Sequence, residues 1–155
     1  MNQFDQFQNA LSLETISEKT FRINPDVRYF VGKTPHGGYL NALMHKALIS
    51  LVPHSFAISS SIQYLDRIEA KDMILEVEVF KVSRGSSSGI VKLIQDNRIC
   101  TVFNAICSDF EHMKGYDGLK TAPPEIIKEF SREEYKDLNY TNCRTSTVFI
   151  ILRKP

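Results

Sequence analysis

The sequence has 155 residues, the size of one domain, and a chain of this length buries about two thirds of its unfolded surface. Its 43% hydrophobic and 24% charged residues are typical of a soluble globular protein and exclude a disordered, collagenous or membrane-spanning chain. A formal net charge of +1 provides no general attraction for a polyanion, so we expect no nucleic-acid partner.

The three cysteines and the N-terminal residues indicate where the protein works. Cys100, Cys107 and Cys143 are odd in number and lack CxxC spacing, which favours reduced, buried thiols in a reducing compartment. Residues 1–10 are polar rather than basic and then apolar, and no apolar run reaches the length of a membrane span. We therefore expect an intracellular protein, located in the cytoplasm.

A helix follows the first extended segment. Residues 11–30 mix β-branched, aromatic and polar side chains and predict one or two short strands and a loop. The string GYLNALMHKALISLV then predicts a helix over residues 38–52, ended by Pro53. Its apolar residues have helical spacing, and its few charges indicate a buried central helix; they are Leu40, Leu43, Met44, Ala47, Leu48 and Leu51.

Four strands are predicted after this helix. Alternating or β-rich runs place them at residues 55–65, 73–82, 90–95 and 99–110. Turns are predicted at RGSSSG, residues 84–89, and at Asp96-Asn97. Consecutive strands in hairpins pair antiparallel, so the fold class is α+β, with an antiparallel sheet wrapped around one long central helix.

The composition changes after residue 112. We assign residues 1–112 to one domain and residues 113–155 to a charged, linker-like segment, since glycines and Pro123-Pro124 interrupt its pattern. The β-rich residues 145–152 predict a terminal edge strand or the beginning of a further unit.

Three strings carry a family resemblance. They are TPHGGYLNAL at residues 34–43, SSSIQYLDRIEAKD at residues 59–72 and VEVFKVSRGSSSGIVKLIQDNRICTVFNA at residues 77–105. In this order and spacing, the sequence resembles the N-terminal half of acyl-CoA thioesterases that carry two hot-dog modules in one chain. Arg84-Gly85-Ser86 stands where many relatives read Gly-Arg-Ser.

The resemblance implies a hot-dog fold and a protein that cleaves or binds acyl-CoA or a related thioester. It also implies a homodimer or higher homo-oligomer, since hot-dog modules pair edge to edge. Relatives place an Asp, a Thr or Ser, and a Gln in a second half for which this chain has no room. A catalytically inactive acyl-thioester-binding module and a structural module therefore remain alternatives.

The glycines that open the helix provide the candidate oxyanion site. The backbone N–H groups of Gly38 and Tyr39 are predicted to point free toward a thioester oxygen, helped by the positive end of the helix. The alternative is that Gly37 and Gly38 merely turn the chain tightly against a strand.

A group that activates water is harder to assign, because residues 38–52 contain no carboxylate. The catalytic candidates are Asn41 on the first helical turn, Asp66 after the second predicted strand, and Gln95, which matches a strand glutamine of the family. Gln63 is a candidate for substrate binding. Asp66 has the alternative of an exposed ion pair with Arg67.

Further residues are candidates for binding the CoA part. His36 and Gly37 lie at the helix start, where His36 either donates to the thioester or to CoA, or instead caps the helix or bonds a loop carbonyl. Lys81, Arg84 and Ser86 flank the predicted hairpin and suit phosphate oxygens, unless this is an ordinary solvated hairpin. No cofactor is expected, and no metal, because His45 and His54 are not spaced with a carboxylate or cysteine.

Overall fold

The computed structural model describes residues 3–112. The predicted linker-like segment and its terminal strand lie outside these residues, as does Cys143. In chain order the elements are α1 (Gln3–Ala10), β1 (Glu14–Ser17), β2 (Thr20–Ile23), the 3-10 turn η1 (Val27–Tyr29), β3 (Phe30–Val31), β4 (Thr34–Pro35), α2 (Gly37–Ile49), β5 (Phe56–Tyr64), β6 (Met73–Val82), β7 (Ser87–Gln95), β8 (Arg98–Ser108) and the 3-10 turn η2 (Phe110–His112).

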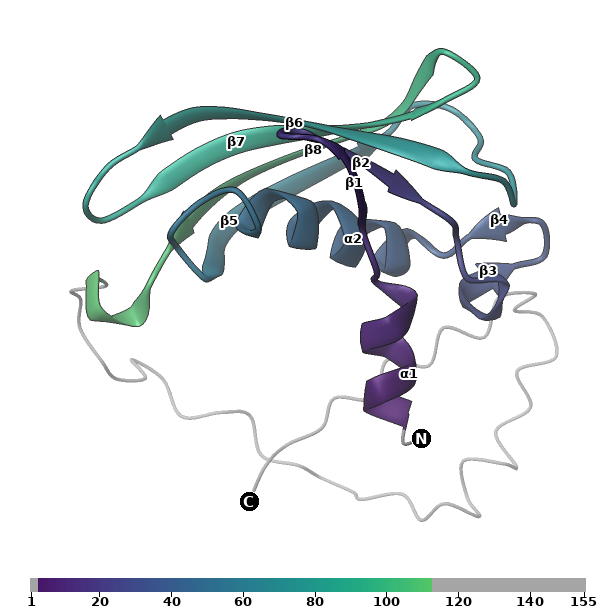
Figure 1. The fold of residues 1–155 in the computed structure, drawn as a ribbon, viewed down its shortest axis with the longest axis horizontal. Coiled ribbons are helices and arrows are strands. Elements are labelled where there is room, and N and C mark those ends of the chain that lie inside the picture. The colour runs from purple at the N-terminus through teal and green to yellow at the C-terminus, as the bar shows by residue number, and fades with distance from the viewer. Residues whose placement is uncertain (1–2, 113–155) are drawn as a thin grey trace, which may run out of the picture. The chain divides into compact units, whose positions relative to one another are not determined.

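One antiparallel sheet forms most of the fold. Its six strands are ordered β1-β2-β6-β7-β8-β5, and β3 pairs with β4 in a separate two-stranded sheet. The large sheet arches over α2, which lies along its concave side (Figure 1). The predicted α+β class, with an antiparallel sheet wrapped around one central helix, is confirmed.

The core lies between α2 and the sheet. The apolar stripe of α2 is almost inaccessible to solvent and consists of Tyr39, Leu40, Leu43, Met44, Ala47 and Leu48. Alternate residues of β6, β7 and β8 face it, among them Leu75, Leu93 and Phe103. Each fully buried side chain of this size contributes about 1.5–3 kcal/mol to folding.

Several predicted boundaries need correction. The central helix ends at Ile49, three residues before the predicted end, because Ser50 already serves as its C-cap. The turn predicted at residues 84–89 is shorter. Ser83 and Ser86 close it, since the Ser83 N–H donates to the Ser86 carbonyl at 2.8 Å, and β7 begins at Ser87.

The predicted β-turn and buried cysteines agree with the structure, whereas the N-terminal helix was missed. The Asp96-Asn97 turn is confirmed, with φ angles of 53° and 59° at these two residues. Cys100 and Cys107 are free and buried, as expected. Helix α1 was not predicted; its short apolar signal is Phe7 and Ala10, three residues apart, which pack in or against the core.

Gly89 sets the spacing between β7 and α2. A Cβ atom at this position would lie 2.7 Å from Leu48 Cδ1 and 2.8 Å from the Glu78 carbonyl oxygen. The strand therefore approaches the helix closely because residue 89 has no side chain.

We predict that Gly89→Ala lowers the free energy of unfolding by about 1–3 kcal/mol, because the added methyl group overpacks the core. Gly85→Ala is the matched control, since its Cβ would meet only His112 Cβ at 3.9 Å. Chemical denaturation should give a change of less than about 0.5 kcal/mol for the control. Equal stability of both variants would contradict this packing.

Candidate functional site

The N-terminal end of α2 is capped from within the chain. His36 is the N-cap residue, and its Nδ1 accepts a hydrogen bond from Gly38 N–H at 3.1 Å. Tyr39 N–H donates to the His36 carbonyl at 3.0 Å. The prediction that the N–H groups of Gly38 and Tyr39 point free is therefore wrong, whereas the capping alternative for His36 is confirmed.

Gly37 offers the backbone donor that remains at this helix end. Its N–H makes no hydrogen bond among residues 3–112, whereas its carbonyl accepts from the Tyr64 hydroxyl at 2.8 Å. A Cβ at Gly37 would lie 2.6 Å from that hydroxyl oxygen, so β5 packs here against bare backbone. Gly37 thus lets β5 approach the helix start closely, as in the alternative that the glycines turn the chain tightly against a strand. It also leaves a donor at the positive helix end.

A cavity of about 380 Å³ adjoins this helix end. Its lining is largely aromatic or apolar and comes from α1, the η1–β3 segment and the start of α2; the residues are Phe7, Arg28, Tyr29, Phe30, Val31, His36, Gly38 and Tyr39. Such a lining suits an apolar group with a polar end.

The Tyr39 side chain holds this region together. Its hydroxyl donates to the Ala10 carbonyl at 2.8 Å and accepts from Asp26 N–H at 3.1 Å. Its ring stacks on Tyr29 with a centroid distance of 5.1 Å, and burial raises its pKa. Tyr39 therefore anchors α1 and η1 to the central helix.

A second polar position lies further along α2. Asn41 and His45 are one turn apart and share a face, and in the described part of the chain Asn41 Oδ1 and His45 Nε2 are buried without a hydrogen-bond partner. The His45 ring lies edge-on to Phe103 of β8, with centroids 6.3 Å apart. Buried polar atoms without partners are rare in native proteins, so these two atoms are available to water or to a bound group at this face.

Burial also adjusts the chemistry of His45. Desolvation lowers its pKa below the ordinary 6.5, so the ring is neutral at pH 7 and one nitrogen can accept a proton. From the sequence, His45 was considered only as a metal ligand, and a buried, neutral ring at this position was not predicted. Its signal is the four-residue spacing from Asn41 on an otherwise apolar helix.

Two other catalytic candidates are occupied elsewhere. Gln95 is buried, and its amide accepts from Glu69 N–H at 2.9 Å and donates to the Lys71 carbonyl at 3.1 Å, which fixes the β5–β6 loop. Asp66 is paired with Arg98 of β8, not with the side chain of Arg67 as the alternative assumed. These contacts give no support to catalytic roles for Gln95 and Asp66.

The predicted binding residues are not all brought together. Tyr64 reaches α2, so strand alternation turns the neighbouring Gln63 to the opposite face of β5. Lys81, Arg84 and Ser86 lie at the β6–β7 hairpin, where the Arg84 carbonyl is 3.3 Å from His54 Nε2 beyond the C-terminal end of α2.

The length of α2 separates these groups within one copy. At a rise of about 1.5 Å per residue, Gly37 N–H and His45 are roughly 12 Å apart. The cationic side chains of the β6–β7 hairpin, Lys81 and Arg84, lie beyond the other end of the helix. A donor at Gly37 and a base at His45 of the same copy therefore cannot reach one carbonyl group.

Comparison with known families identifies the described domain. The family "Acyl-CoA thioesterase N-terminal domain" matches residues 26–108, more than half of the chain. The matched region contains α2, the Gly37 helix start and strands β5 to β8. No curated protein matches the sequence.

Solved structures share the fold at low sequence identity. A thioesterase II homologue from Thermobifida fusca has 20% identity and a TM-score of 0.68, covering 77% of this chain and 46% of its own. A hot-dog protein of unknown function from Alicyclobacillus acidocaldarius has 17% identity and a TM-score of 0.68, covering 79% and 46%. The chain spans about half the length of these two proteins.

A smaller neighbour was solved with a ligand. The hypothetical thioesterase from Streptococcus pneumoniae, determined with coenzyme A, has 18% identity and a TM-score of 0.55, covering 68% of this chain and 94% of its own. The predicted hot-dog fold is confirmed by these structures. Within residues 3–112, no helix combines the length and apolar character needed to cross a membrane.

We predict that the His45 ring titrates with a midpoint below 6.5 by proton NMR, because burial disfavours its charged form. The unfolded chain then binds this proton first, so the free energy of unfolding falls as the pH drops from 6.5 to the folded midpoint. His45→Gln should remove that part of the pH dependence. A midpoint at or above 6.5 would contradict the described burial.

Proposed function

Because the chain belongs to the acyl-CoA thioesterase N-terminal domain family, we propose that it hydrolyses acyl-CoA thioesters as a pair of hot-dog modules. The observation that carries this proposal is a pair of groups on α2 without hydrogen-bond partners among residues 3–112, the Gly37 N–H and the neutral His45 Nε2. A thioester hydrolase requires a donor for the carbonyl oxygen and a base for water.

The reaction follows from these two groups. Gly37 N–H donates to the thioester oxygen as negative charge develops there, helped by the helix dipole. His45 accepts a proton from water while the water oxygen forms a bond to the carbonyl carbon. The C–S bond then breaks, and His45 returns the proton to the leaving thiolate, giving a carboxylic acid and free CoA. Asn41 orients the water beside His45.

Two copies complete the site. In a two-fold pair with antiparallel central helices, the start of α2 in one copy lies near the middle of α2 in the other. Gly37 of one copy then meets His45 of its partner, which overcomes the separation of roughly 12 Å within one copy. The same arrangement brings the hairpin residues Lys81, Arg84 and Ser86 toward the partner's Gly37 end.

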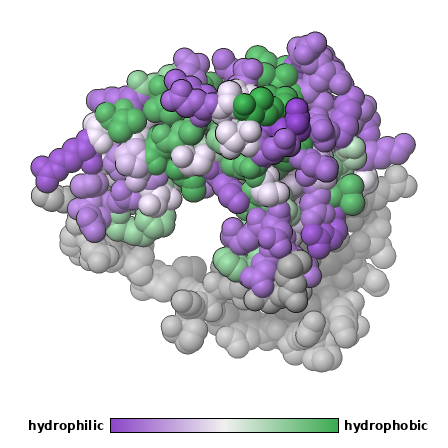
Figure 2. Space-filling view, in the orientation of Figure 1, coloured by the Kyte–Doolittle hydropathy of each residue, from purple (hydrophilic) through white to green (hydrophobic). Residues whose placement is uncertain are grey.

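Strand β5 is the proposed pairing edge. It is an edge of the sheet, it is nine residues long, and its Phe56 and Ile58 side chains are 43% and 50% exposed. The opposite edge strand β1 has four residues and an irregular register, which discourages pairing. Hydrophobic residues interrupt the hydrophilic surface over the sheet (Figure 2).

The aromatic cavity beside α2 is the proposed place of the acyl chain. Its lining includes His36 and Gly38, which flank Gly37 in the chain, and is largely aromatic or apolar, which suits an alkyl or aryl group. The hairpin cations of the partner are left for the phosphates of CoA. We propose a cytoplasmic location, since the buried cysteines Cys100 and Cys107 are free.

A catalytically inactive thioester-binding module is the second candidate. Residues 37–49 contain no Asp or Glu, so the base depends on His45 alone. Such a module binds CoA esters without releasing CoA, and the assay below separates the two functions.

We predict that the full chain releases CoA from at least one member of a short- to long-chain acyl-CoA series. His45→Gln should lower kcat by about 10²–10⁴-fold, the usual contribution of a general base. Asp66→Asn is the matched control and should retain turnover, because the Asp66 carboxylate forms an ion pair with Arg98. Loss of turnover in the control with retention in His45→Gln would reverse the assignment of the base.

The pairing edge gives a separate prediction. Ile58→Lys should convert the dimer to a monomer in sedimentation experiments, because a lysine on an edge strand opposes strand pairing. Ile106→Lys is the control, since Ile106 is 45% exposed on β8, an inner strand of the sheet. A wild-type monomer, or an Ile58→Lys dimer, would exclude pairing through β5.

A further inference from the structure

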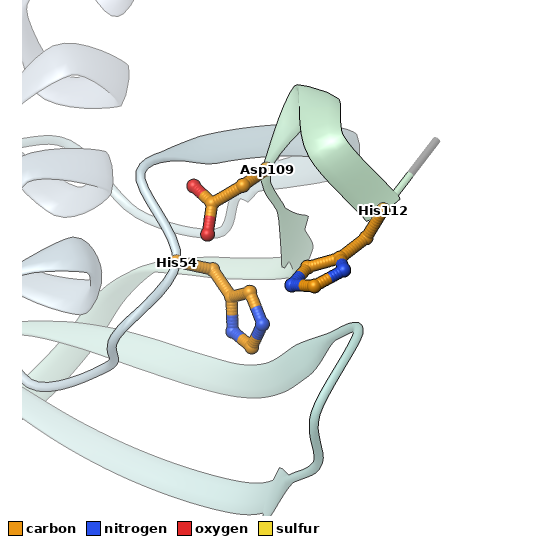
Figure 3. Close-up of side chains that lie close together, drawn as sticks. All are labelled: His54, Asp109 and His112. Carbon is orange, nitrogen blue, oxygen red and sulfur yellow. The ribbon is translucent and has the colours of Figure 1, made fainter. Parts of the chain in front are cut away.

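We propose that His54, Asp109 and His112 bind a divalent transition-metal ion of the zinc class. Their ligand atoms all lie within 4.8 Å of one another. Figure 3 shows the two imidazole rings with nitrogen atoms turned toward each other and the Asp109 carboxylate beside the His54 ring. His54 comes from the α2–β5 connection, and Asp109 and His112 come from the end of β8 and η2.

His54 is held in position by the β6–β7 hairpin. It is buried, its Nδ1 lies 2.7 Å from Ser87 Oγ, and its Nε2 lies 3.3 Å from the Arg84 carbonyl. A carbonyl only accepts, so Nε2 carries the proton and Nδ1 accepts from Ser87. When a metal binds Nε2, the proton moves to Nδ1 and Ser87 Oγ becomes the acceptor, while the Arg84 carbonyl turns to water.

The result of this exchange is the usual arrangement of a metal-binding histidine. One ring nitrogen binds the metal, and the other donates to a fixed oxygen that orients the ring. Ser87 is 1% exposed and cannot move away. The long contact between Nε2 and the Arg84 carbonyl is the one that the metal replaces.

Asp109 is oriented by a different segment. Its Oδ1 accepts from Ser55 N–H at 2.8 Å, which leaves Oδ2 for a metal. Hydrogen-bonded carboxylates of this kind are common around metals. Two of the three ligands are therefore held in place by hydrogen bonds that do not involve the third.

His112 supplies the movement that the site requires. A tetrahedral ion with bonds of about 2.0–2.1 Å needs its ligand atoms about 3.4 Å apart, so atoms that now lie within 4.8 Å of one another must approach by at most about 1.4 Å. His112 is exposed at the end of a three-residue turn, and its ring centroid lies 6.1 Å from that of His54. A change in its side-chain rotamer brings its nitrogen closer at small cost.

The ligand set selects the ion. Two imidazoles and one carboxylate favour Zn²⁺, Co²⁺ or a similar ion over Mg²⁺ and Ca²⁺, which prefer oxygen ligands. Water takes the fourth position of a tetrahedral ion. No metal site was expected from the sequence, because only the spacing of nearby residues was considered. This group instead brings residues 54 and 109 together through the fold.

The ion would fasten three segments at one end of the domain. It links the α2–β5 connection and η2 directly, and through Ser87 it reaches the β6–β7 hairpin. The site lies beyond the C-terminal end of α2, away from Gly37 and His45 in the same copy. Its role is therefore to stabilise this end of the domain, including the β6–β7 hairpin.

The test is a Co²⁺ and Zn²⁺ titration of the full, tag-free chain. We expect a Co²⁺ absorption band typical of tetrahedral coordination, displaced by Zn²⁺, and a Zn²⁺-dependent rise in Tm of about 5 °C. His112→Ala and Asp109→Asn should each weaken Co²⁺ binding at least about 10-fold. Asn at position 109 still accepts from Ser55 N–H, so this variant keeps the local fold.

Glu111→Gln is the matched control. Glu111 is an exposed carboxylate in the same turn and is not part of the group, so its loss changes the charge equally and should leave binding unchanged. Absence of the band at millimolar Co²⁺, or equal weakening by Glu111→Gln, would overturn the proposal. Comparing Tm without metal shows that each variant is folded.

Discussion

Burial of the apolar stripe of α2 against the concave side of the sheet is the interaction on which the rest of the structure depends. The helix carries a single charged residue, Lys46, so most of its surface must be covered. One sheet covers one side of it, and Gly89 allows β7 to approach closely. The same packing leaves Asn41 and His45 facing the side toward β8, with polar atoms that find no partner among residues 3–112.

This constraint explains why one copy of the domain holds a candidate donor and a candidate base that cannot act on the same carbonyl group. The helix dipole and Gly37 offer a donor at one end of α2, and His45 offers a base near its middle. A rigid helix holds them roughly 12 Å apart, so the two groups of one copy cannot reach the same substrate carbonyl group. The proposed second module beside β5 would bring the two groups together and would also pair the exposed edge of β5.

The sequence predicted those parts of the fold that local pattern controls. The predicted strand at residues 73–82, with Leu75 and Val77 alternating with Glu76 and Glu78, matches β6 at both ends. Asp96-Asn97 marked the turn between β7 and β8, because these residues tolerate positive φ. The start of β7 was missed, since Ser87 and Gly89 have turn composition but are held in a strand by packing against α2. Tertiary contacts outweigh local preference there.

The site was predicted less completely for the same reason. Gly37 and Gly38 were identified from their position at the helix start, but which N–H stays free depends on the rotamer of His36. Gln95 resembled a catalytic residue, yet its role depends on a loop that it meets only in the fold. The burial of His45 likewise arises from long-range packing against β8.

The most direct test of the two-module site is a crystal structure with a non-hydrolysable acyl-CoA analogue. We expect the analogue's carbonyl oxygen to accept from Gly37 N–H of one copy, with a water between its carbonyl carbon and His45 of the other. A carbonyl group bound away from Gly37, or one that contacts Gly37 and His45 of the same copy, would contradict it.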